Sequence, residues 1–383
     1  MKIGWICLSG IGPSESFLVD TLHQLENIGQ VIGVSGVSTG ARAASANHRY
    51  IPFNEHPLTV WHTLGRKLTG RNKYREQLQA RCLKMSRDVW VENEPDVFWV
   101  EFGTTAVVAK DLLKEQNKPF FIAVHGYDIT TEFKDEEYQA QFIDLANHHQ
   151  CKAIVCASHY TRRLCILAGV RAEKCQVVRL ALDGERIKRD AKIKKTEQPS
   201  FVHFGRLTEK KHPIATFEAF RQVVQSIPNA SLTFIGDGPL RSELERRIAE
   251  FGLGEQVQCL GVMEQSEALK DVQRHWVFVQ HSVTAKSGDQ EGFALSPAEA
   301  ALMEMPVVST LHNGIPEHVI DGKTGYLVNE FDYETMADRM IELAGNESAR
   351  ATFGKHGRSN VLKICSKEIR FKQLSKLITA QIA

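Results

Sequence analysis

The sequence predicts an α/β fold with two parallel sheets, and three observations support this. Short apolar runs rich in β-branched residues recur along all 383 residues, and most are apolar throughout rather than alternating with polar residues. Such runs are typical of strands buried on both faces of a parallel sheet. Helical patterns lie between the runs, as expected of helices that cover both faces of a sheet. The runs number eleven, too many for one ordinary doubly wound sheet, so we expect two sheets.

The expected strands are spread over both halves of the chain. They cover residues 2–8, 31–37, 97–103, 120–126, 153–158 and 176–180, and then 201–205, 231–236, 257–261, 276–281 and 307–311. Residues 213–227 form one of the expected helices, because Pro213 suits the first helical position and apolar residues follow at helical spacing.

A composition shift predicts the domain boundary. Residues 184–200 are polar and charged, which is typical of a linker. We therefore expect an N-terminal domain over residues 1–183 and a C-terminal domain over residues 201–365. The apolar spacing near the end of the chain predicts a final helix within 366–383.

Composition also excludes several classes of protein. Lys plus Arg number 47 and Asp plus Glu 46, and this near-neutral balance argues against a nucleic-acid partner. No apolar run approaches the length of a membrane-spanning helix, and the short run at residues 3–8 lacks a signal-peptide cleavage site. The eight cysteines are scattered without a Cys-x2-Cys pair, so we expect a reducing, cytoplasmic location and no metal site.

The segment 290–300 predicts a helix start at a ligand site. Ser296, Pro297 and Glu299 fit an N-cap, a first helical residue and the acidic member of a capping box. A helix N-terminus behind a glycine-containing turn can bind an anion, because its free N–H groups and dipole point toward it. A purely capping role is the alternative for Glu299.

Two loops at strand ends add positive charge and tight turns. Arg206 and Lys211 follow the strand 201–205, at the carboxyl end where open α/β sheets bind ligands. Together they can neutralise a diphosphate. Gly236 and Gly238 follow the next strand and predict a turn without side chains at the same edge.

The first domain offers weaker signals. Residues 9–17 follow the first strand and contain two glycines, but not the third glycine of a dinucleotide-binding fingerprint. His125 ends the strand that begins at residue 120, where it can touch a ligand hydroxyl or serve as a hydrogen-bonded structural residue.

Taken together, these segments resemble the retaining glycosyltransferase family 4, which has the GT-B fold. Glu291 and Glu299 match that family's Glu-x7-Glu pattern. Similar segments are Gly205-Arg206-Leu207 with Lys211, residues 235–240, 307–310, 313–317 and 321–328, and, in the first domain, 13–17 and His125-Gly126. The resemblance is closest over 201–330, and it is strongest to bacterial exopolysaccharide and lipopolysaccharide transferases. His212 and Glu304 stand where the family usually has glycine.

The resemblance implies two Rossmann-like domains that face a central cleft, with residues 366–383 crossing back to the N-terminal domain. It implies transfer of a sugar, with retention, from a UDP- or GDP-sugar to a hydroxyl of a glycan or lipid-linked glycan in bacterial surface polysaccharide synthesis. No metal or other cofactor is implied. A non-catalytic nucleotide-sugar-binding partner of another transferase and a nucleotide-sugar 2-epimerase are the alternatives.

The resemblance also implies roles for individual residues. Glu291 would hold donor-sugar hydroxyls, Glu299 the ribose hydroxyls, and His125 would lie near the transferring sugar. The implied catalytic residues are Glu291, His125, Arg206 and Lys211. The implied substrate-binding residues are Gly12, Glu15, Ser16, Asp128, Gly205, Gly236, Gly238, Gly292, Phe293, Ala294, Leu295 and Glu299.

Residues 61–87 carry a local excess of positive charge. They contain a single acid, Glu76, and eight bases: Arg66, Lys67, Arg71, Lys73, Arg75, Arg81, Lys84 and Arg87. A basic helix with interspersed aromatic and aliphatic residues can lie on an anionic membrane surface, whereas a solvated helix face is the alternative.

If this segment binds the membrane, the protein should float with anionic liposomes at low salt and be released at high salt, because salt screens such attraction. Replacement of Arg66, Lys67, Arg71 and Lys73 by glutamate should abolish flotation while leaving nucleotide binding intact. Absence of binding to anionic vesicles at low salt would make the segment an ordinary exposed face.

Overall fold

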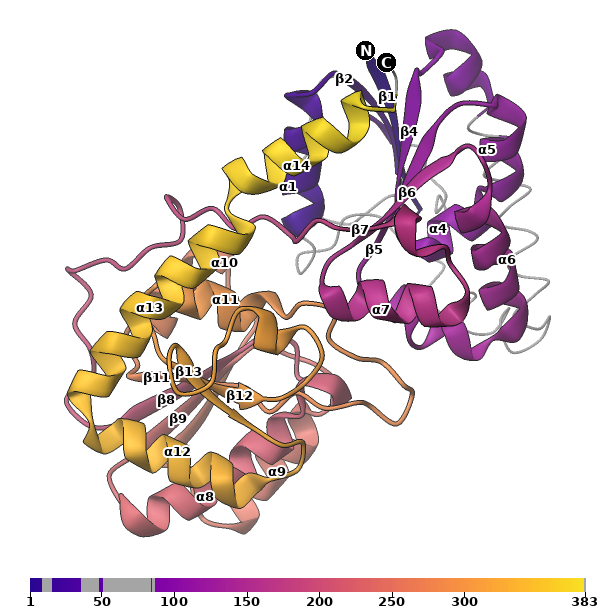
Figure 1. Ribbon diagram of the computed structural model, residues 1–383. Helices are drawn as coiled ribbons and strands as arrows, with labels where there is room; N and C mark the ends of the chain where they lie inside the picture. The colour runs from indigo at the N-terminus through magenta and orange to yellow at the C-terminus, as the bar shows by residue number, and fades with distance from the viewer. Residues whose placement is uncertain (9–15, 36–47, 51–83, 85–86, 382–383) are drawn as a thin grey trace. The chain divides into compact units, whose positions relative to one another are not determined.

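The structure is a computed structural model of the chain, and it describes residues 1–8, 16–35, 48–50, 84 and 87–381. Of the basic segment 61–87, all but Lys84 and Arg87 lies outside the described residues, so its membrane role stays a prediction. Gly12 and Glu15 also lie outside them. The chain forms two compact units (Figure 1). Unit 1 contains Met1–Ala181 and Arg370–Ala383, and unit 2 contains Leu182–Ile369.

Unit 1 is built on a parallel sheet of seven described strands. In spatial order they are β3 (His48–Tyr50), β2 (Gln30–Ser35), β1 (Lys2–Cys7), β4 (Val97–Glu101), β5 (Phe120–Val124), β6 (Cys151–Cys156) and β7 (Cys175–Val177). Its helices are α1 (Ser16–Glu26), α4 (Gly103–Val108), α5 (Lys110–Gln116), α6 (Glu136–Asn147), α7 (His159–Ala168) and the C-terminal α14 (Lys367–Thr379). The strand order reverses between β1 and β4, which is where doubly wound sheets open a ligand site.

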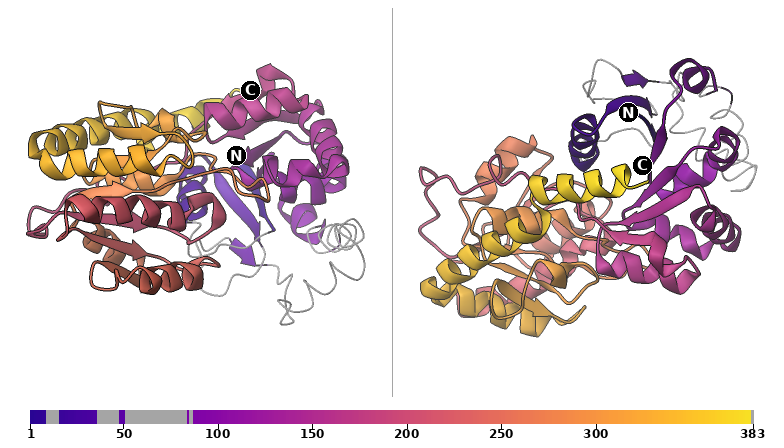
Figure 2. Two further views of the ribbon diagram at one scale, coloured as in Figure 1. Left: turned by 90° about the horizontal axis from the view of Figure 1, so that it is seen from below. Right: turned by 45° about the horizontal axis from the view of Figure 1, so that its top comes forward.

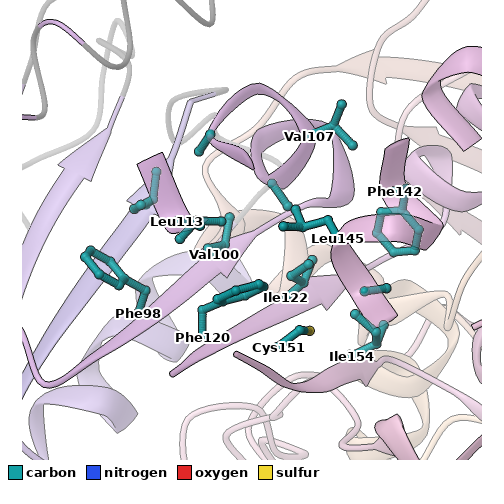
Figure 3. Close-up of a cluster of buried hydrophobic side chains, with 14 of the residues drawn as sticks. Phe98, Val100, Val107, Leu113, Phe120, Ile122, Phe142, Leu145, Cys151 and Ile154 are labelled. Atoms are coloured by element: carbon teal, nitrogen blue, oxygen red, sulfur yellow. The ribbon is translucent and has the colours of Figure 1, made fainter. Parts of the chain in front are cut away.

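The core of unit 1 lies on both faces of this sheet. Alternate residues of β5 point to opposite faces: Phe120 and Ile122 join one cluster, and Phe121 joins the other. Figure 3 shows the first cluster, where Phe120 and Ile122 lie with Phe142 and Leu145 of α6. This two-sided burial explains why the strands are continuously apolar in sequence.

Helix α14 packs in the second cluster of unit 1. Leu374 and Ile378 are fully buried there with Trp5 of β1 and Leu22 of α1. The side chain of Arg370 is also buried, and its Nη1 donates a hydrogen bond to Thr21 Oγ1 at 2.9 Å. The last helix is therefore part of the N-terminal unit.

Unit 2 repeats the architecture with a six-stranded parallel sheet (Figure 1, Figure 2). In spatial order its strands are β10 (Val257–Gly261), β9 (Ser231–Ile235), β8 (Ser200–Phe204), β11 (Val277–Val279), β12 (Val307–Thr310) and β13 (Gly325–Val328). Its helices are α8 (Pro213–Ser226), α9 (Arg241–Glu250), α10 (Gln265–Val272), α11 (Leu295–Leu302), α12 (Tyr333–Gly345) and α13 (Glu347–Cys365). The order reverses between β8 and β11.

The two-sheet α/β prediction is confirmed, and each of the eleven predicted runs contains a strand with ends shifted by a few residues. The sequence prediction missed β3 and β13. Both are short edge strands: β3 has the polar sequence His-Arg-Tyr, and β13 is only four residues long, so neither shows the long apolar run of a central strand.

The segment 184–200, predicted as a linker, lies within unit 2. Its backbone pairs with the turn before β11: the Thr196 N–H donates to the Arg274 carbonyl, and Trp276 Nε1 donates to the Thr196 carbonyl, both at 2.9 Å. The polar residues of 184–200 therefore belong to an extended segment on the surface of unit 2, not to a linker between the two units. Within the part of the chain that the structure describes, no helix is both long and apolar enough to cross a membrane.

Candidate functional site

Lys211 lies at the centre of the candidate site in unit 2. It ends the 3-10 turn Glu209–Lys211, in the loop that leaves β8 at the point where strand order reverses. Its Nζ lies 3.0 Å from Glu291 Oε1, and 3.4 Å from both Gln280 Oε1 and Ser296 Oγ. The ammonium thus joins the loop after β8, the end of β11, the loop before α11 and the first turn of α11.

Glu291 is an ionised carboxylate in a buried position. Burial raises the pKa of its carboxyl, but the Lys211 and Lys210 ammonium groups outweigh that effect and bring the pKa down to about 2. Lys210 itself pairs with Asp289, Nζ to Oδ1, at 3.1 Å. The site therefore holds two largely buried cations against two carboxylates.

Close backbone contacts surround Lys211. Gly205 and Gly236 have left-handed φ values of 147° and 136°, and a Cβ on Gly236 would lie 2.0 Å from the Gly205 carbonyl oxygen. A Cβ on Gly238 would lie 2.5 Å from the Leu207 carbonyl oxygen. The predicted side-chain-free turn therefore exists, because the loop after β9 packs directly on the loop after β8.

The loop before α11 is held in place by the segment after β12. The Glu291 N–H donates to His312 Nε2 at 3.2 Å, so Nε2 is an acceptor and His312 Nδ1–H donates to Glu330 Oε1 at 2.6 Å. His318 Nε2 donates to the Phe293 carbonyl at 2.8 Å. A Cβ on Gly314 would lie 2.2 Å from the Gly292 carbonyl oxygen. Glu291 is therefore positioned through its backbone as well as through Lys211.

The predicted capping box is wrong. Helix α11 begins at Leu295, after Ala294, which takes a left-handed φ of 61° and provides no side-chain cap. This start lies two residues earlier than the Ser-Pro signal predicts, and it places Pro297 at the third helical position, where no N–H partner is lost. Ser296 Oγ instead approaches Lys211, and Glu299 Oε1 accepts a hydrogen bond from Gln265 Nε2 at 2.9 Å.

The two positions where glycine was expected both keep a left-handed backbone. His212 has φ 36° and its Nδ1 caps α8 by accepting from the Ala215 N–H at 3.0 Å. Glu304 has φ 57° at the end of α11, where its own N–H bonds to the Ala301 carbonyl and that of Met305 to the Ala300 carbonyl. This is a Schellman turn, in which glycine is favoured. The departures from the family pattern therefore leave both turns intact.

Arg206 differs from Lys211 in its surroundings. Its side chain is exposed, and no acidic side chain pairs with it among the described residues. It therefore presents an uncompensated charge beside the loop that carries Lys211. No group of three or more His, Cys, Asp and Glu side chains in the described ranges is arranged to hold a metal ion.

The implied residues of unit 1 are placed as follows. Ser16 opens helix α1. His125 follows β5, and its Nε2 lies 3.0 Å from Glu101 Oε2. Asp128 is buried, and its carboxylate accepts the N–H groups of Gly103, His125 and Gly126 at 2.9, 3.1 and 2.9 Å. Asp128 therefore stabilises the backbone turn that follows β5 and the start of α4.

Several residues that contact the candidate side chains of unit 2 or of unit 1 were missed from the sequence. Gln280 directly follows β11 and could have been found by the rule that ligands lie at carboxyl ends of strands. Gln265, His312 and Glu101 carry no such signal, because each acts through a partner that is distant in sequence: Glu299, Glu291 and His125.

The low pKa of Glu291 predicts acid sensitivity. A carboxyl whose pKa is depressed contributes stability that is complete above its unfolded value, near 4.5, and is lost as pH falls through its folded value, near 2. As the pH falls through this range, the free energy of unfolding of the wild type should decrease by on the order of 3 kcal/mol. Glu291→Gln lacks the carboxyl and should not show this decrease. Urea unfolding across this range measures the difference. The exposed control Glu334→Gln should show the same pH dependence as the wild type. An equal dependence of the free energy of unfolding on pH in all three proteins would contradict the low pKa of Glu291.

Known proteins of similar sequence share the segment that carries this site. Residues 185–360 match the family model described as Glycosyl transferases group 1. The chain is 28% identical over 285 residues to the amylovoran biosynthesis glycosyltransferase AmsK of Erwinia amylovora, covering 74% of this chain and 70% of AmsK. It is 28% identical over 329 residues to WcaL of Escherichia coli K12, provisionally named a colanic acid biosynthesis glycosyltransferase, covering 85% and 79%.

The fold has solved counterparts. The crystal structure of Anabaena HepE in complex with UDP and glucose superposes with a TM-score of 0.79 at 19% identity, covering 99% of this chain and 100% of HepE. Residues 185–360 are therefore similar to the group 1 glycosyl transferases, and the chain has the GT-B fold and resembles glycosyltransferases of bacterial exopolysaccharide biosynthesis.

Proposed function

We propose that the protein transfers a sugar from a nucleoside diphosphate sugar to a hydroxyl of a glycan or lipid-linked glycan in bacterial surface polysaccharide synthesis, with retention at the anomeric carbon. The observation that carries the donor assignment is the Lys211 ammonium, held at the β8–β11 switch point by Glu291, Gln280 and Ser296. HepE, a protein of similar fold, was crystallised with UDP and with UDP-glucose, which supports a nucleotide-sugar donor of the same class.

Lys211 has two states in this proposal. Without donor it neutralises Glu291 at 3.0 Å. A diphosphate carries more negative charge than one carboxylate, so it would draw the ammonium toward itself and leave the Glu291 carboxylate free to accept hydrogen bonds from donor-sugar hydroxyls. The same ammonium would then stabilise the charge that develops on the leaving nucleoside diphosphate.

Two further groups would complete the diphosphate site. Arg206 contributes an exposed guanidinium from the loop after β8. Helix α11 begins without a side-chain cap, so its first N–H groups and dipole favour an anion. We propose that these charges, rather than a metal ion, offset the diphosphate. Retention rests on the resemblance to family 4 alone.

Release of nucleoside diphosphate tests the proposal. Purified protein should release it from one member of a panel of UDP- and GDP-sugars, and faster with acceptor. Lys211→Ala and Arg206→Ala should each lower the rate by roughly 10²–10³, as loss of one group that stabilises a developing anion does. Lys355→Ala, an exposed lysine on α13, is the matched control and should retain the wild-type rate.

The outcomes separate the alternatives. A 2-epimerase would convert the donor without consuming an acceptor, and a non-catalytic partner would bind the nucleotide without turnover. Near-normal rates in both Lys211→Ala and Arg206→Ala would overturn the assignment of the diphosphate site. Chelation by EDTA should leave the rate unchanged, and loss of activity that Mg²⁺ restores would refute the metal-free form of the proposal.

Glu299 is proposed to bind the ribose hydroxyls of the nucleotide, as a carboxylate can accept two hydrogen bonds at once. Glu299→Gln should keep the melting temperature and weaken binding of the nucleoside diphosphate by roughly tenfold to a hundredfold, the value of a hydrogen bond to a charged group. Calorimetric titration measures the affinity, with the exposed Glu255→Gln as control. Unchanged affinity in Glu299→Gln would leave the residue with a structural role that includes its contact to Gln265.

A further inference from the structure

A buried carboxylate contacts His125 inside unit 1. Glu101 ends strand β4, His125 follows the neighbouring strand β5, and the parallel register pairs Glu101 with Ala123. The Glu101 side chain is completely buried, and its Oε2 lies 3.0 Å from His125 Nε2. Carboxylates are almost never fully buried unless they are paired, so this contact needs a reason.

Glu101 is held as an acceptor on its Oε1. Its Oε1 receives the indole N–H of Trp99 at 2.8 Å and that of Trp5 at 3.4 Å. An indole nitrogen can only donate. Burial raises the pKa of the Glu101 carboxyl, but the hydrogen bond and charge of His125, the Trp99 hydrogen bond and the Arg370 guanidinium together bring it below its ordinary value.

An ionised carboxylate has no proton to give, so His125 must present Nε2–H to it. In the neutral imidazole the other nitrogen, Nδ1, is then unprotonated and is an acceptor. His125 Nδ1 is buried and has no hydrogen-bond partner among the described residues. An acceptor left in this state costs free energy unless a donor arrives, and a ligand hydroxyl is such a donor.

The imidazole is also fixed sterically. The rings of Phe17 and Phe102 flank it, each with its centroid 4.8 Å from that of His125. Phe102 has a left-handed φ of 68°, a strained value for an aromatic residue. Asp128 accepts the His125 N–H and so fixes the backbone. Backbone strain of this kind persists where the surroundings over-determine a conformation.

We propose that Glu101 is a positioning residue that locks His125 in the Nε2–H tautomer, so that Nδ1 is offered as an acceptor to a hydroxyl of the carbohydrate substrate. The role of His125 in binding a carbohydrate hydroxyl rests on the proposed function, whereas the assignment of its tautomer does not. Glu101 touches no substrate in this scheme and acts only through His125.

The variant Glu101→Gln reverses the polarity of the contact at nearly constant shape. Its amide oxygen can still accept from Trp99 and Trp5, which turns the amide NH2 toward His125. Nε2 must then accept, and the proton moves to Nδ1. Trp99→Phe is the matched control: it removes one donor to Oε1 but leaves the carboxylate, so the tautomer should stay as in the wild type.

Nitrogen NMR of the full chain labelled with 15N-histidine tests the tautomer at pH 9, well above the ordinary histidine pKa of about 6.5. The signals of His125 are those that vanish in His125→Asn. We expect a protonated Nε2 and an unprotonated Nδ1 in the wild type and in Trp99→Phe, and the reverse in Glu101→Gln. A wild-type His125 protonated on Nδ1, or on both nitrogens, would overturn the proposal even if Glu101→Gln failed to fold.

A double-mutant cycle tests the purpose, using nucleoside diphosphate release from the best UDP- or GDP-sugar. Glu101→Gln should lower kcat/KM by roughly tenfold to a hundredfold. This is the value of one buried hydrogen bond, which is lost when His125 Nδ1 changes from an acceptor to a donor. In the His125→Ala background the same change should have no further effect, because interacting residues are not additive. An equal loss in both backgrounds would make Glu101 merely structural. If the wild type releases no nucleotide, the proposed function fails while the NMR result still decides the tautomer.

Discussion

The ion pair between Lys211 and Glu291 is the interaction on which the rest of the site depends. Both partners are largely buried, and a buried ion pair is worth little by itself because desolvation offsets its attraction. The role of the pair is to position two loops. It fixes the loop after β8 to the loop before α11, while Gln280 and Ser296 supply the remaining polar contacts of the ammonium. In the proposed function, a diphosphate would take the place of Glu291 beside the Lys211 ammonium, while Gln280 and Ser296 stay in place.

Backbone shape supports that interaction as much as side chains do. Lys211 is followed by His212 in the left-handed region, and Glu291 is followed three residues later by Ala294 in the same region. Neither residue is glycine, so each turn carries a conformational cost of roughly 1–2 kcal/mol. The surrounding structure bears this cost: the His212 imidazole caps α8, and His318 and Gly314 hold the backbone of residues 292–293.

The sequence predicted those features whose cause is local. Buried central strands show as continuous apolar runs, and Lys211, Gly205 and Gly236 lie where the rule on strand ends places a ligand. The capping box at Ser296 was predicted wrongly, because the backbone takes a left-handed turn at Ala294, next to residues 292–293 that pack against Gly314, which is distant in sequence. Glu101 was missed for a related reason. Its contact with His125 exists only because β4 and β5 are neighbours in the sheet, and a lone glutamate after an apolar run does not reveal that.

The last helix has a consequence for the order in which the protein folds during synthesis. Unit 1 is discontinuous in sequence: residues 1–181 are synthesised before unit 2, whereas Arg370–Ala383 leave the ribosome only after all of unit 2. Until then the apolar cluster of unit 1 lacks Leu374 and Ile378, and Glu101 lacks the charge of Arg370. Domains generally fold as they emerge, but this one cannot complete its core before residues 370–383 have been synthesised. A chain that stops short of residue 370 would therefore contain every residue of the Lys211 site and an incomplete core around His125.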